Sequence, residues 1–137
     1  MPQVVTCILE HEGQILLLKR SSLVGTYRGL WGGVAGYVEE DEAPYDTALK
    51  EIREEAGLDL EQVSLVKQGN PVEFSDEYDG RRYEWMIYPF LFHVEQKEPI
   101  HIDWEHEDYQ WIDPKDLHRF ESVPHLKMVV AQFFELR

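Results

Sequence analysis

The sequence lacks the features of secreted, membrane-spanning or disulfide-rich proteins. A single cysteine, Cys7, among 137 residues excludes a disulfide within the chain, and its apolar neighbours predict a small buried hydrophobe. No run approaches the roughly 20 apolar residues that a membrane-spanning helix needs, and the N-terminus has no charged leader before an apolar signal core. We therefore expect a soluble, cytoplasmic protein that does not bind a membrane.

Basic residues are also scarce. The chain has 13 Lys and Arg against 27 Asp and Glu, which gives a formal net charge of −14. Such a surface repels the phosphates of DNA and RNA, so we expect no nucleic-acid partner. A small phosphorylated ligand remains compatible with this charge if a divalent cation neutralises the contact.

The chain length and a hydrophobic fraction of 43% predict one domain over residues 1–137. Hydrophobic periodicity and turn residues predict a mixture of strands and helices. The expected order is a hairpin (4–9 and 14–20), a long loop (21–37), a helix (41–56), strands (63–66, 72–74, 83–94 and 109–112), a capped helical turn (113–117) and a last helix capped by Ser122. Pro89 interrupts the longest apolar run and predicts a bulge or an edge there.

The expected helix from Asp41 to Ala56 carries a cluster of carboxylates. At about 100° per residue, its apolar stripe consists of Tyr45, Leu49, Ile52 and Ala56. Three glutamates gather on the face away from that stripe, namely Glu51, Glu54 and Glu55. Two interpretations are open: a solvated acidic face steadied by neighbouring cations, or a site for a hard divalent cation, which takes oxygen ligands.

These glutamates belong to a longer pattern that runs from Gly36 to Leu58. It resembles the Nudix box, Gly-x5-Glu-x7-Arg-Glu-U-x-Glu-Glu-x-Gly-U, where U is a bulky aliphatic residue. Every fixed position matches except one, because Lys50 stands where the family has Arg. The resemblance implies an α/β fold, an α/β/α sandwich with a mixed central sheet. It also implies hydrolysis of the diphosphate linkage in a nucleoside diphosphate derivative, with Mg²⁺ or Mn²⁺ as cofactor.

The resemblance also implies roles for single residues. Glu51 and Glu55 match the family's principal metal ligands, and Glu54 matches a further ligand or water activator. The carbonyl of Ala35, just before the box glycine, matches another metal contact. Structural support of the box falls to Gly36, Glu42, Lys50 and Gly57. At position 50 an Arg would fork two hydrogen bonds onto carboxylates, whereas Lys offers a point charge with freer geometry.

Outside the box, Glu105 in the segment Trp104–Trp111 resembles the Glu-His…Trp feature common in the family. A carboxylate there could accept a proton from the attacking water, and Glu107 and Asp108 compete for that role. His106 is expected to be a hydrogen-bonding loop residue rather than a base.

The long loop offers candidate substrate contacts. Arg20 and Arg28 could each pair bidentately with a diphosphate. Tyr27 and Trp31 could stack on a base, although aromatic residues in such loops are equally often core lids.

Three other functions stay open: a nucleotide-binding sensor without turnover, an isoprenoid diphosphate isomerase on the same fold, and an acidic structural module. The isomerase needs a cysteine acid or base at the pocket, and Cys7 on an early strand is poorly placed for that. Family members commonly pair through sheet edges, so a homodimer is also open. The residues do not choose among nucleoside triphosphates, nucleotide sugars, ADP-ribose and dinucleotides.

Overall fold

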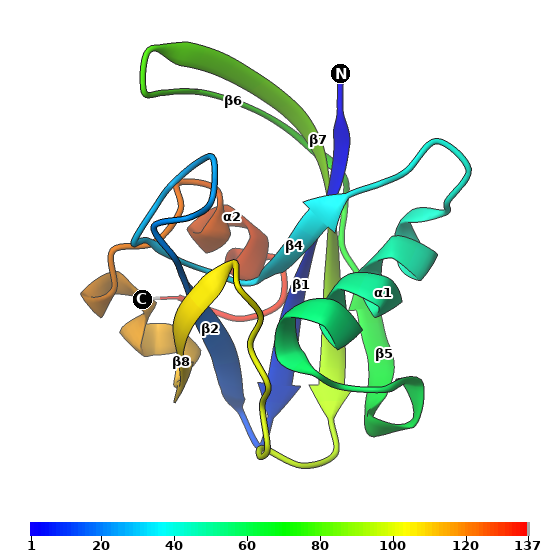
Figure 1. Cartoon of the computed structure of the whole chain (residues 1–137). Helices are drawn as coiled ribbons and strands as arrows, with labels where there is room; N and C mark the ends of the chain where they lie inside the picture. The colour runs from blue at the N-terminus through cyan, green and yellow to red at the C-terminus, as the bar shows by residue number, and fades with distance from the viewer. Residues whose placement is uncertain (137) are drawn as a thin grey trace.

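A mixed sheet with helices on both faces organises the chain in the computed structural model, which describes residues 1–136 (Figure 1). The elements are β1 (Gln3–His11), β2 (Gln14–Arg20), β3 (Trp31–Gly32), β4 (Val34–Tyr37), α1 (Pro44–Ala56), η1 (Leu60–Gln62), β5 (Val63–Gln68), β6 (Val72–Tyr78), β7 (Arg81–Val94), β8 (His106–Ile112), η2 (Pro114–Arg119) and α2 (Leu126–Ala131). The strand order is β3-β2-β1-β7-β5, with β4 paired to β1, β6 to β7 and β8 to β2. Only β1 and β7 run parallel among these pairs of described strands. The expected α/β/α sandwich is confirmed.

The central strands send alternate side chains into two cores. On β1, Cys7 and Leu9 face α1, whereas Ile8 faces α2. Because helices cover both faces, the strands read as nearly continuous apolar runs rather than as alternating ones. Cys7 is buried, as its apolar neighbours predict.

Two tight turns hold the hairpins. Glu12 and Gly13 join β1 to β2 with φ of 47° and 83°, and Asp79 and Gly80 join β6 to β7 with φ of 54° and 78°. Two consecutive residues with positive φ are typical of the turns whose twist matches that of the flanking strands. The predicted hairpin over residues 4–20 is confirmed, and the strands expected at 72–74 and 83–94 form a second hairpin.

The expected loop over residues 21–37 is wrong at its C-terminal end, where β3 and β4 form. The pattern there shows no period because β4 contains Gly36 in the middle of its pairing with β1, opposite Val5. As expected, the ladder is interrupted at Pro89 on one side, although Pro89 pairs with Thr6 of β1 on the other side of the central strand β7. Its pairing with β5 ends at Phe90 and its pairing with β6 begins at Ile87. Pro89, which has no backbone N–H to donate, therefore lies in the gap between these two partner strands.

Helix α1 begins at Pro44 rather than Asp41. Ala43 is the N-cap residue and no side chain caps the helix there. The fixed φ of Pro44 sets the start of the helix. Gly57 ends the helix with φ of 72°, and its N–H donates to the Arg53 carbonyl. This predicted stop is confirmed.

The buried face of α1 is rotated from the expected stripe. It consists of Thr47, Ala48, Ile52, Glu55 and Ala56. Tyr45, which the periodicity assigns to the core, is 39% exposed. The helix packs against β4 and β1, and this contact turns a glutamate toward the sheet.

The C-terminal segment differs from expectation at one cap. The Asp113 carboxylate accepts from the N–H of Lys115, as the predicted capped turn requires. Helix α2 has His125 as its N-cap residue, whereas Ser122 forms an isolated bridge with Trp31. Within the described residues, no helix combines the length and apolarity that crossing a bilayer would take.

Candidate active site

Helix α1 presses two glutamates onto the backbone of β4. Glu55 is only 2% exposed, and its Oε1 accepts a hydrogen bond of 3.2 Å from the N–H of Ala35. Glu51 lies against the next residue, because a Cβ added to Gly36 would sit 2.4 Å from the Glu51 carboxyl carbon. The Glu51 carboxyl therefore occupies space that the side chain of any other residue at position 36 would fill.

Burial shapes the acidity of this pair. Burial raises the pKa of Glu51 to about 7, assisted by the charges of Glu54 and Glu105. Burial also raises the pKa of Glu55 well above its ordinary value, and the hydrogen bond with Glu51 adds to this, while the Ala35 N–H acts in the opposite direction. Two adjoining carboxyls in such surroundings retain a proton between them unless a cation replaces it.

Two further carboxylates lie within electrostatic reach. Glu54 is exposed on α1, and its charge helps to raise the pKa of both Glu51 and Glu105. Glu105 is half-buried just before β8, where burial raises its pKa and Arg20 opposes that rise. The structure therefore brings the four predicted glutamates into one acidic cluster, formed by Glu51, Glu54, Glu55 and Glu105.

His106 stands behind this acidic cluster. Its Nδ1 lies 3.0 Å from Asp103 Oδ1 and its Nε2 lies 3.9 Å from Glu55 Oε1. Burial lowers the pKa of His106. The hydrogen bond to Asp103 matches the expected loop role, but the closeness to Glu55 has no signal in the sequence beyond the Glu-His pair.

Arg20 lies within electrostatic reach of Glu55 and Glu105. Its guanidinium donates to the Thr26 carbonyl at 2.9 Å and to the Thr26 hydroxyl at 3.2 Å. Burial lowers the pKa of Arg20, while the charges of Glu55 and Glu105 raise it. A half-buried guanidinium beside carboxylates is suited to holding a phosphate group.

The other predicted loop residues are packed against the protein. Tyr27 is buried and its hydroxyl donates to Asp76 at 2.6 Å. Trp31 lies edge-on to Phe120, with 5.4 Å between ring centroids. Arg28 donates to the Val24 carbonyl at 2.9 Å. The structure thus brings Arg20 to the acidic cluster, and it gives the two aromatic rings packing partners.

Lys50, the departure from the box pattern, joins the box loop to the helix. Its Nζ donates to both carboxylate oxygens of Glu42, at 3.1 Å and 2.9 Å. The Thr47 hydroxyl donates to the same carboxylate at 2.9 Å. Both contacts lower the pKa of Glu42, the Lys50 hydrogen bond more strongly.

We expect Lys50→Ala to lower turnover about tenfold, because Glu42 then loses its cation and the box loop is held less firmly. Lys50→Arg should keep nearly full turnover, because a guanidinium can reach the same carboxylate. Steady-state kinetics of the two variants side by side test this. Equal activity of Lys50→Ala and the parent protein would show that the bridge has no part in the reaction.

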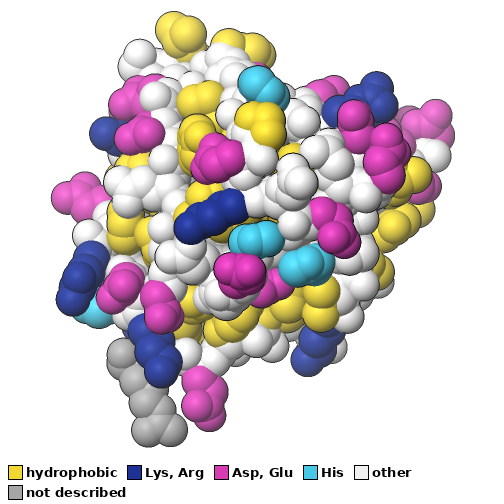
Figure 2. All heavy atoms as spheres, turned by 90° about the horizontal axis from the view of Figure 1, so that it is seen from below, with side chains coloured by type: hydrophobic (Ala, Val, Ile, Leu, Met, Phe, Trp, Pro, Cys, Tyr) yellow, Lys and Arg dark blue, Asp and Glu magenta, His cyan; other side chains and the backbone are white. Residues whose placement is uncertain are grey.

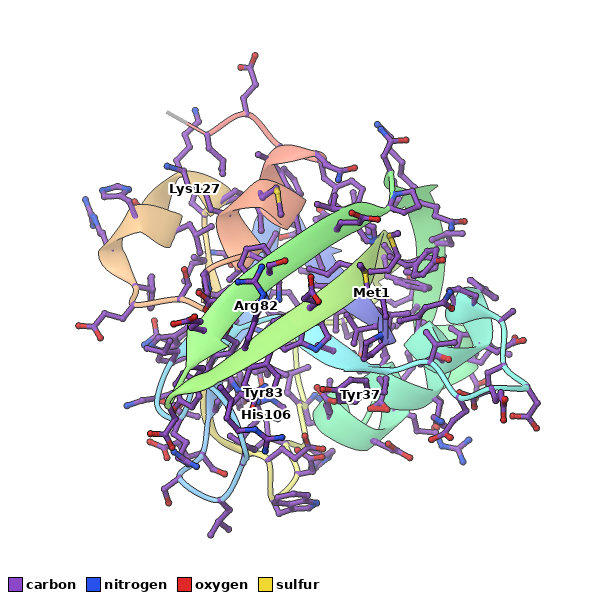
Figure 3. All side chains as sticks on the ribbon, turned by 90° about the horizontal axis from the view of Figure 1, so that it is seen from above. Met1, Tyr37, Arg82, Tyr83, His106 and Lys127 are labelled. Carbon is purple, nitrogen blue, oxygen red and sulfur yellow. The ribbon has the colours of Figure 1, made fainter. Side chains whose placement is uncertain are left out.

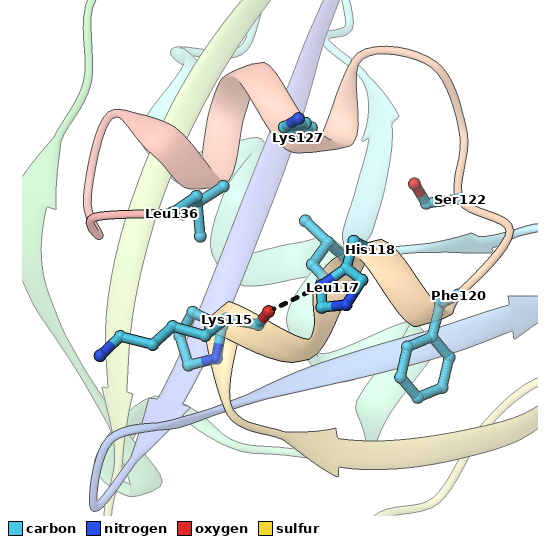
Figure 4. Close-up of a pocket in the computed structure, with 8 residues that line it drawn as sticks. Lys115, Leu117, His118, Phe120, Ser122, Lys127 and Leu136 are labelled. Carbon is cyan, nitrogen blue, oxygen red and sulfur yellow. Dashed lines mark hydrogen bonds between the residues drawn. The ribbon is translucent and has the colours of Figure 1, made fainter.

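A pocket of about 390 Å³ lies elsewhere, between η2 and α2 (Figure 4). Its lining contains no carboxylate and consists of Pro114, Lys115, Leu117, His118, Phe120, Ser122, Lys127 and Leu136. The His118 ring donates from Nδ1 to the Lys115 carbonyl at 2.9 Å, which fixes that side chain. None of the carboxylates that could hold a cation lines this pocket.

The donor set of the acidic cluster fits a hard divalent ion. Within residues 1–136, no three His, Cys, Asp or Glu side chains already converge on one point as metal ligands would. The half-buried carboxyl of Glu51 and the buried carboxyl of Glu55 nevertheless adjoin each other beside a bare glycine backbone. Carboxylate oxygens are the ligands that Mg²⁺ and Mn²⁺ prefer. An ion bound here would take the place of the proton that the two carboxyls share.

Comparison with known proteins identifies the family. The family model of the NUDIX domain matches residues 1–133. The chain belongs to this family. It is 32% identical over 125 residues to the nucleoside triphosphatase NudI of Escherichia coli O139:H28, with 86% of each chain covered. It is accordingly an enzyme of the Nudix hydrolase type, a pyrophosphohydrolase in a family that generally uses divalent metal ions.

Solved structures show the same fold at lower identity. The dihydroneopterin triphosphate pyrophosphohydrolase of E. coli superposes with a TM-score of 0.80 at 22% identity, covering 96% of this chain and 93% of the other. A MutT NUDIX hydrolase from Burkholderia pseudomallei gives 0.76 at 22% identity, covering 97% and 98%. The Ap4A hydrolase of C. elegans in a binary complex gives 0.75 at 17% identity, covering 97% and 95%.

The structure also bears on the isomerase alternative. Cys7 lies on the α1 side of the sheet, closer to the carboxylates than its early position in the chain suggests. It is 1% exposed, and burial raises the pKa of its thiol, with the charges of Glu55 and Glu51 adding to the effect. A protonated thiol sealed from solvent cannot exchange protons with a substrate.

Proposed function

We propose that this Nudix hydrolase, acting as one domain over residues 1–137, cleaves the diphosphate linkage of a nucleoside diphosphate derivative. The observation that carries the proposal is the buried Glu55 beside Glu51 on the bare backbone of Gly36. The name of the relative at 32% identity, a nucleoside triphosphatase, supports a nucleotide as the substrate. Nucleoside triphosphates contain the linkage in question.

Mg²⁺ or Mn²⁺ is the proposed cofactor, held by the carboxylates of Glu51, Glu54 and Glu55 with the Ala35 carbonyl. When bound, it supplies positive charge that offsets the charge of the diphosphate. Glu51 and Glu55 give up their shared proton on binding, and the Ala35 N–H keeps the Glu55 carboxylate oriented. His106 Nε2, 3.9 Å from the same oxygen of Glu55, further limits the movement of that carboxylate.

Glu105 is the proposed base. It is half-buried and its pKa is raised, mainly by burial, so it takes up a proton more readily than an exposed glutamate. Glu54, exposed on α1, is the second candidate for this role. In either case the carboxylate takes the proton from the attacking water, and no covalent intermediate on the protein is required.

Arg20 is the proposed diphosphate contact, because it lies within electrostatic reach of Glu55 and Glu105. Arg28 is exposed on the same loop and is a second cation for the substrate. We propose that Tyr27 and Trp31 shape this loop through their packing rather than through stacking on a base.

Turnover of a substrate panel tests the proposal. Nucleoside triphosphates, nucleotide sugars, ADP-ribose and dinucleotides are incubated with Mg²⁺ or Mn²⁺ in ¹⁸O-labelled water, and the products are weighed by mass spectrometry. We expect two phosphorylated products, one of which carries the label, and no product after chelation. Tight binding of a nucleotide without any product over hours would favour a sensor instead.

The pH dependence of stability tests the metal site without measuring activity. The pKa of Glu51 rises from 4.5 to about 7 on folding, so its protonation stabilises the fold fully below pH 4.5 and this stabilisation is lost as the pH rises through 7. The full shift would correspond to about 3 kcal/mol, and solvent screening of this partly exposed group reduces our expectation to about 1–2 kcal/mol.

Thermal melting of the metal-free protein and of Glu51→Gln between pH 4.5 and 8 measures this effect. Glu51→Gln serves as the reference because burial lowers the pKa of His106 and His125, which weakens both proteins at acidic pH. We expect the melting temperature of the parent to fall by several degrees relative to the variant as the pH rises. Saturating Mg²⁺ should reverse this fall in the parent alone; parallel curves would contradict the site.

A further inference from the structure

One tryptophan is exposed to solvent beside the acidic cluster. Trp104 is 64% exposed. Trp31 packs on Phe120, and the other two tryptophans donate their indole N–H, to the Tyr37 hydroxyl at 3.3 Å and to the Lys97 carbonyl at 3.0 Å. A large apolar ring in water is unfavourable unless a ligand covers it.

The backbone that carries Trp104 is firmly held. The Ser21 hydroxyl donates to the Trp104 carbonyl at 2.9 Å, and the Ser21 N–H donates to the Glu105 carbonyl at 2.8 Å. The residue before Trp104 is also held, because Oδ1 of Asp103 lies 3.0 Å from Nδ1 of His106. The indole is therefore an exposed side chain on a fixed frame, which suits a binding surface.

The position of this frame ties it to the acidic cluster. Ser21 directly follows Arg20, the proposed diphosphate contact, and Trp104 directly precedes Glu105, the proposed base. Leu23 is 72% exposed, and its N–H donates to the Ser21 hydroxyl at 3.2 Å. Two exposed apolar side chains, Leu23 and Trp104, thus lie on the segments that carry the proposed diphosphate contact and the proposed base.

The aromatic rings of the β6–β7 hairpin are already in contact with one another. Tyr83 stacks on Trp85 at 5.4 Å and Phe74 stacks on Trp85 at 6.2 Å, with 10° between the planes in both pairs. Figure 3 looks onto this hairpin, with Arg82 on its outer side and Tyr83 facing the rest of the molecule. These rings have protein partners, whereas the Trp104 ring has most of its surface free.

We propose that Trp104 stacks on the nucleobase of the substrate, with Leu23 at the rim of the same surface. This inference rests on the proposed function, because a nucleotide whose diphosphate lies at Arg20 and the carboxylates places its base one sugar away. Stacking on an indole is tolerant of base identity because every base has a π-face. Trp104 therefore contributes affinity for nucleotides in general and no hydrogen-bonded selection among them.

Kinetics with nucleoside triphosphates test this contact. We expect Trp104→Ala to raise KM about tenfold with kcat within about twofold, and Trp104→Tyr to restore most of the affinity, because a smaller ring still stacks. Val66→Ala on β5 is the matched control, since Val66 is similarly exposed, at 57%, outside this frame. An unchanged KM in Trp104→Ala would overturn the inference while the hydrolase assignment stands.

Binding measured without turnover separates the two proposals. Intrinsic fluorescence of the parent should be quenched by a nucleoside triphosphate in the presence of Ca²⁺ and left unchanged by inorganic tripolyphosphate, which has no base. The quench should disappear in Trp104→Ala. If no diphosphate compound is hydrolysed but the quench is seen, the base contact stands and the hydrolase proposal fails. If Trp104→Ala changes only the oligomeric state in light scattering, the indole belongs to a protein interface and the inference is wrong.

Discussion

Glu55→Gln will reduce turnover by roughly 10²–10³-fold without lowering the stability of the metal-free protein. Glutamine keeps the shape of the side chain, and its carbonyl can still accept from the Ala35 N–H. Burial raises the pKa of Glu55 and so favours a protonated, uncharged carboxyl in the metal-free protein, which the neutral amide resembles. The substitution removes an anionic oxygen from the proposed ion site. The reaction therefore loses a ligand while the fold keeps a neutral side chain of the same shape.

Two measurements check this expectation on the same samples, namely steady-state turnover with Mg²⁺ and thermal melting after chelation. Glu61→Gln is the control for loss of one negative charge, because Glu61 is exposed on η1, away from the acidic cluster. Full activity of Glu55→Gln would remove the central support of the assignment. A large fall in its melting temperature would show that Glu55 has a structural rather than a catalytic role.

The box pattern located the acidic cluster, but it did not show how deeply one member is buried. Helical periodicity assigns Glu55 to the polar face, because it treats a helix as a cylinder with one apolar stripe. In the structure the stripe is rotated, and Glu55 lies under the backbone of Ala35 while Tyr45 is partly exposed. That rotation depends on the approach of β4, a strand that no period in the sequence indicates.

The exposure of aromatic residues in segments without a hydrophobic period could not be predicted from the sequence either. Tyr27 and Trp31 were candidates for stacking because they lie in a long glycine-containing loop, yet both are packed. No local pattern distinguishes Trp104, which is followed by a run of acidic residues, yet its side chain is exposed. Exposure of such a residue depends on which segments fold back over it, and no local pattern reports that.

The charge of the surface was predictable from composition alone. Figure 2 shows a face with more Asp and Glu than Lys and Arg side chains, in keeping with the net charge of −14. What composition could not reveal is that Arg20 lies within reach of the buried carboxylates. Its position follows from β2 ending beside β8, where Arg20 pairs with His106.

Gly36→Ala will reduce turnover about 100-fold while changing stability by no more than about 1 kcal/mol. The added Cβ would lie 2.4 Å from Cδ and 2.5 Å from Oε1 of Glu51, so this carboxyl must move away from β4. Cγ of Glu51 would lie 2.6 Å from the added Cβ, and this half-buried side chain is flexible, so it can rotate away at little cost to the fold. The displaced carboxylate no longer adjoins Glu55, and the proposed ion loses one of its ligands.

Gly25→Ala is the matched control, because a Cβ at Gly25 meets nothing within 4 Å. Kinetics, calorimetric Mn²⁺ binding and thermal melting of both variants give the comparison. We expect weaker Mn²⁺ binding and slow turnover only for Gly36→Ala, with similar melting temperatures for both. If Gly36→Ala binds Mn²⁺ like the parent, the ion does not need Glu51 in its present place. The contact between this carboxyl and the glycine backbone would then be a packing feature, and the ligand set would have to be sought among the remaining glutamates.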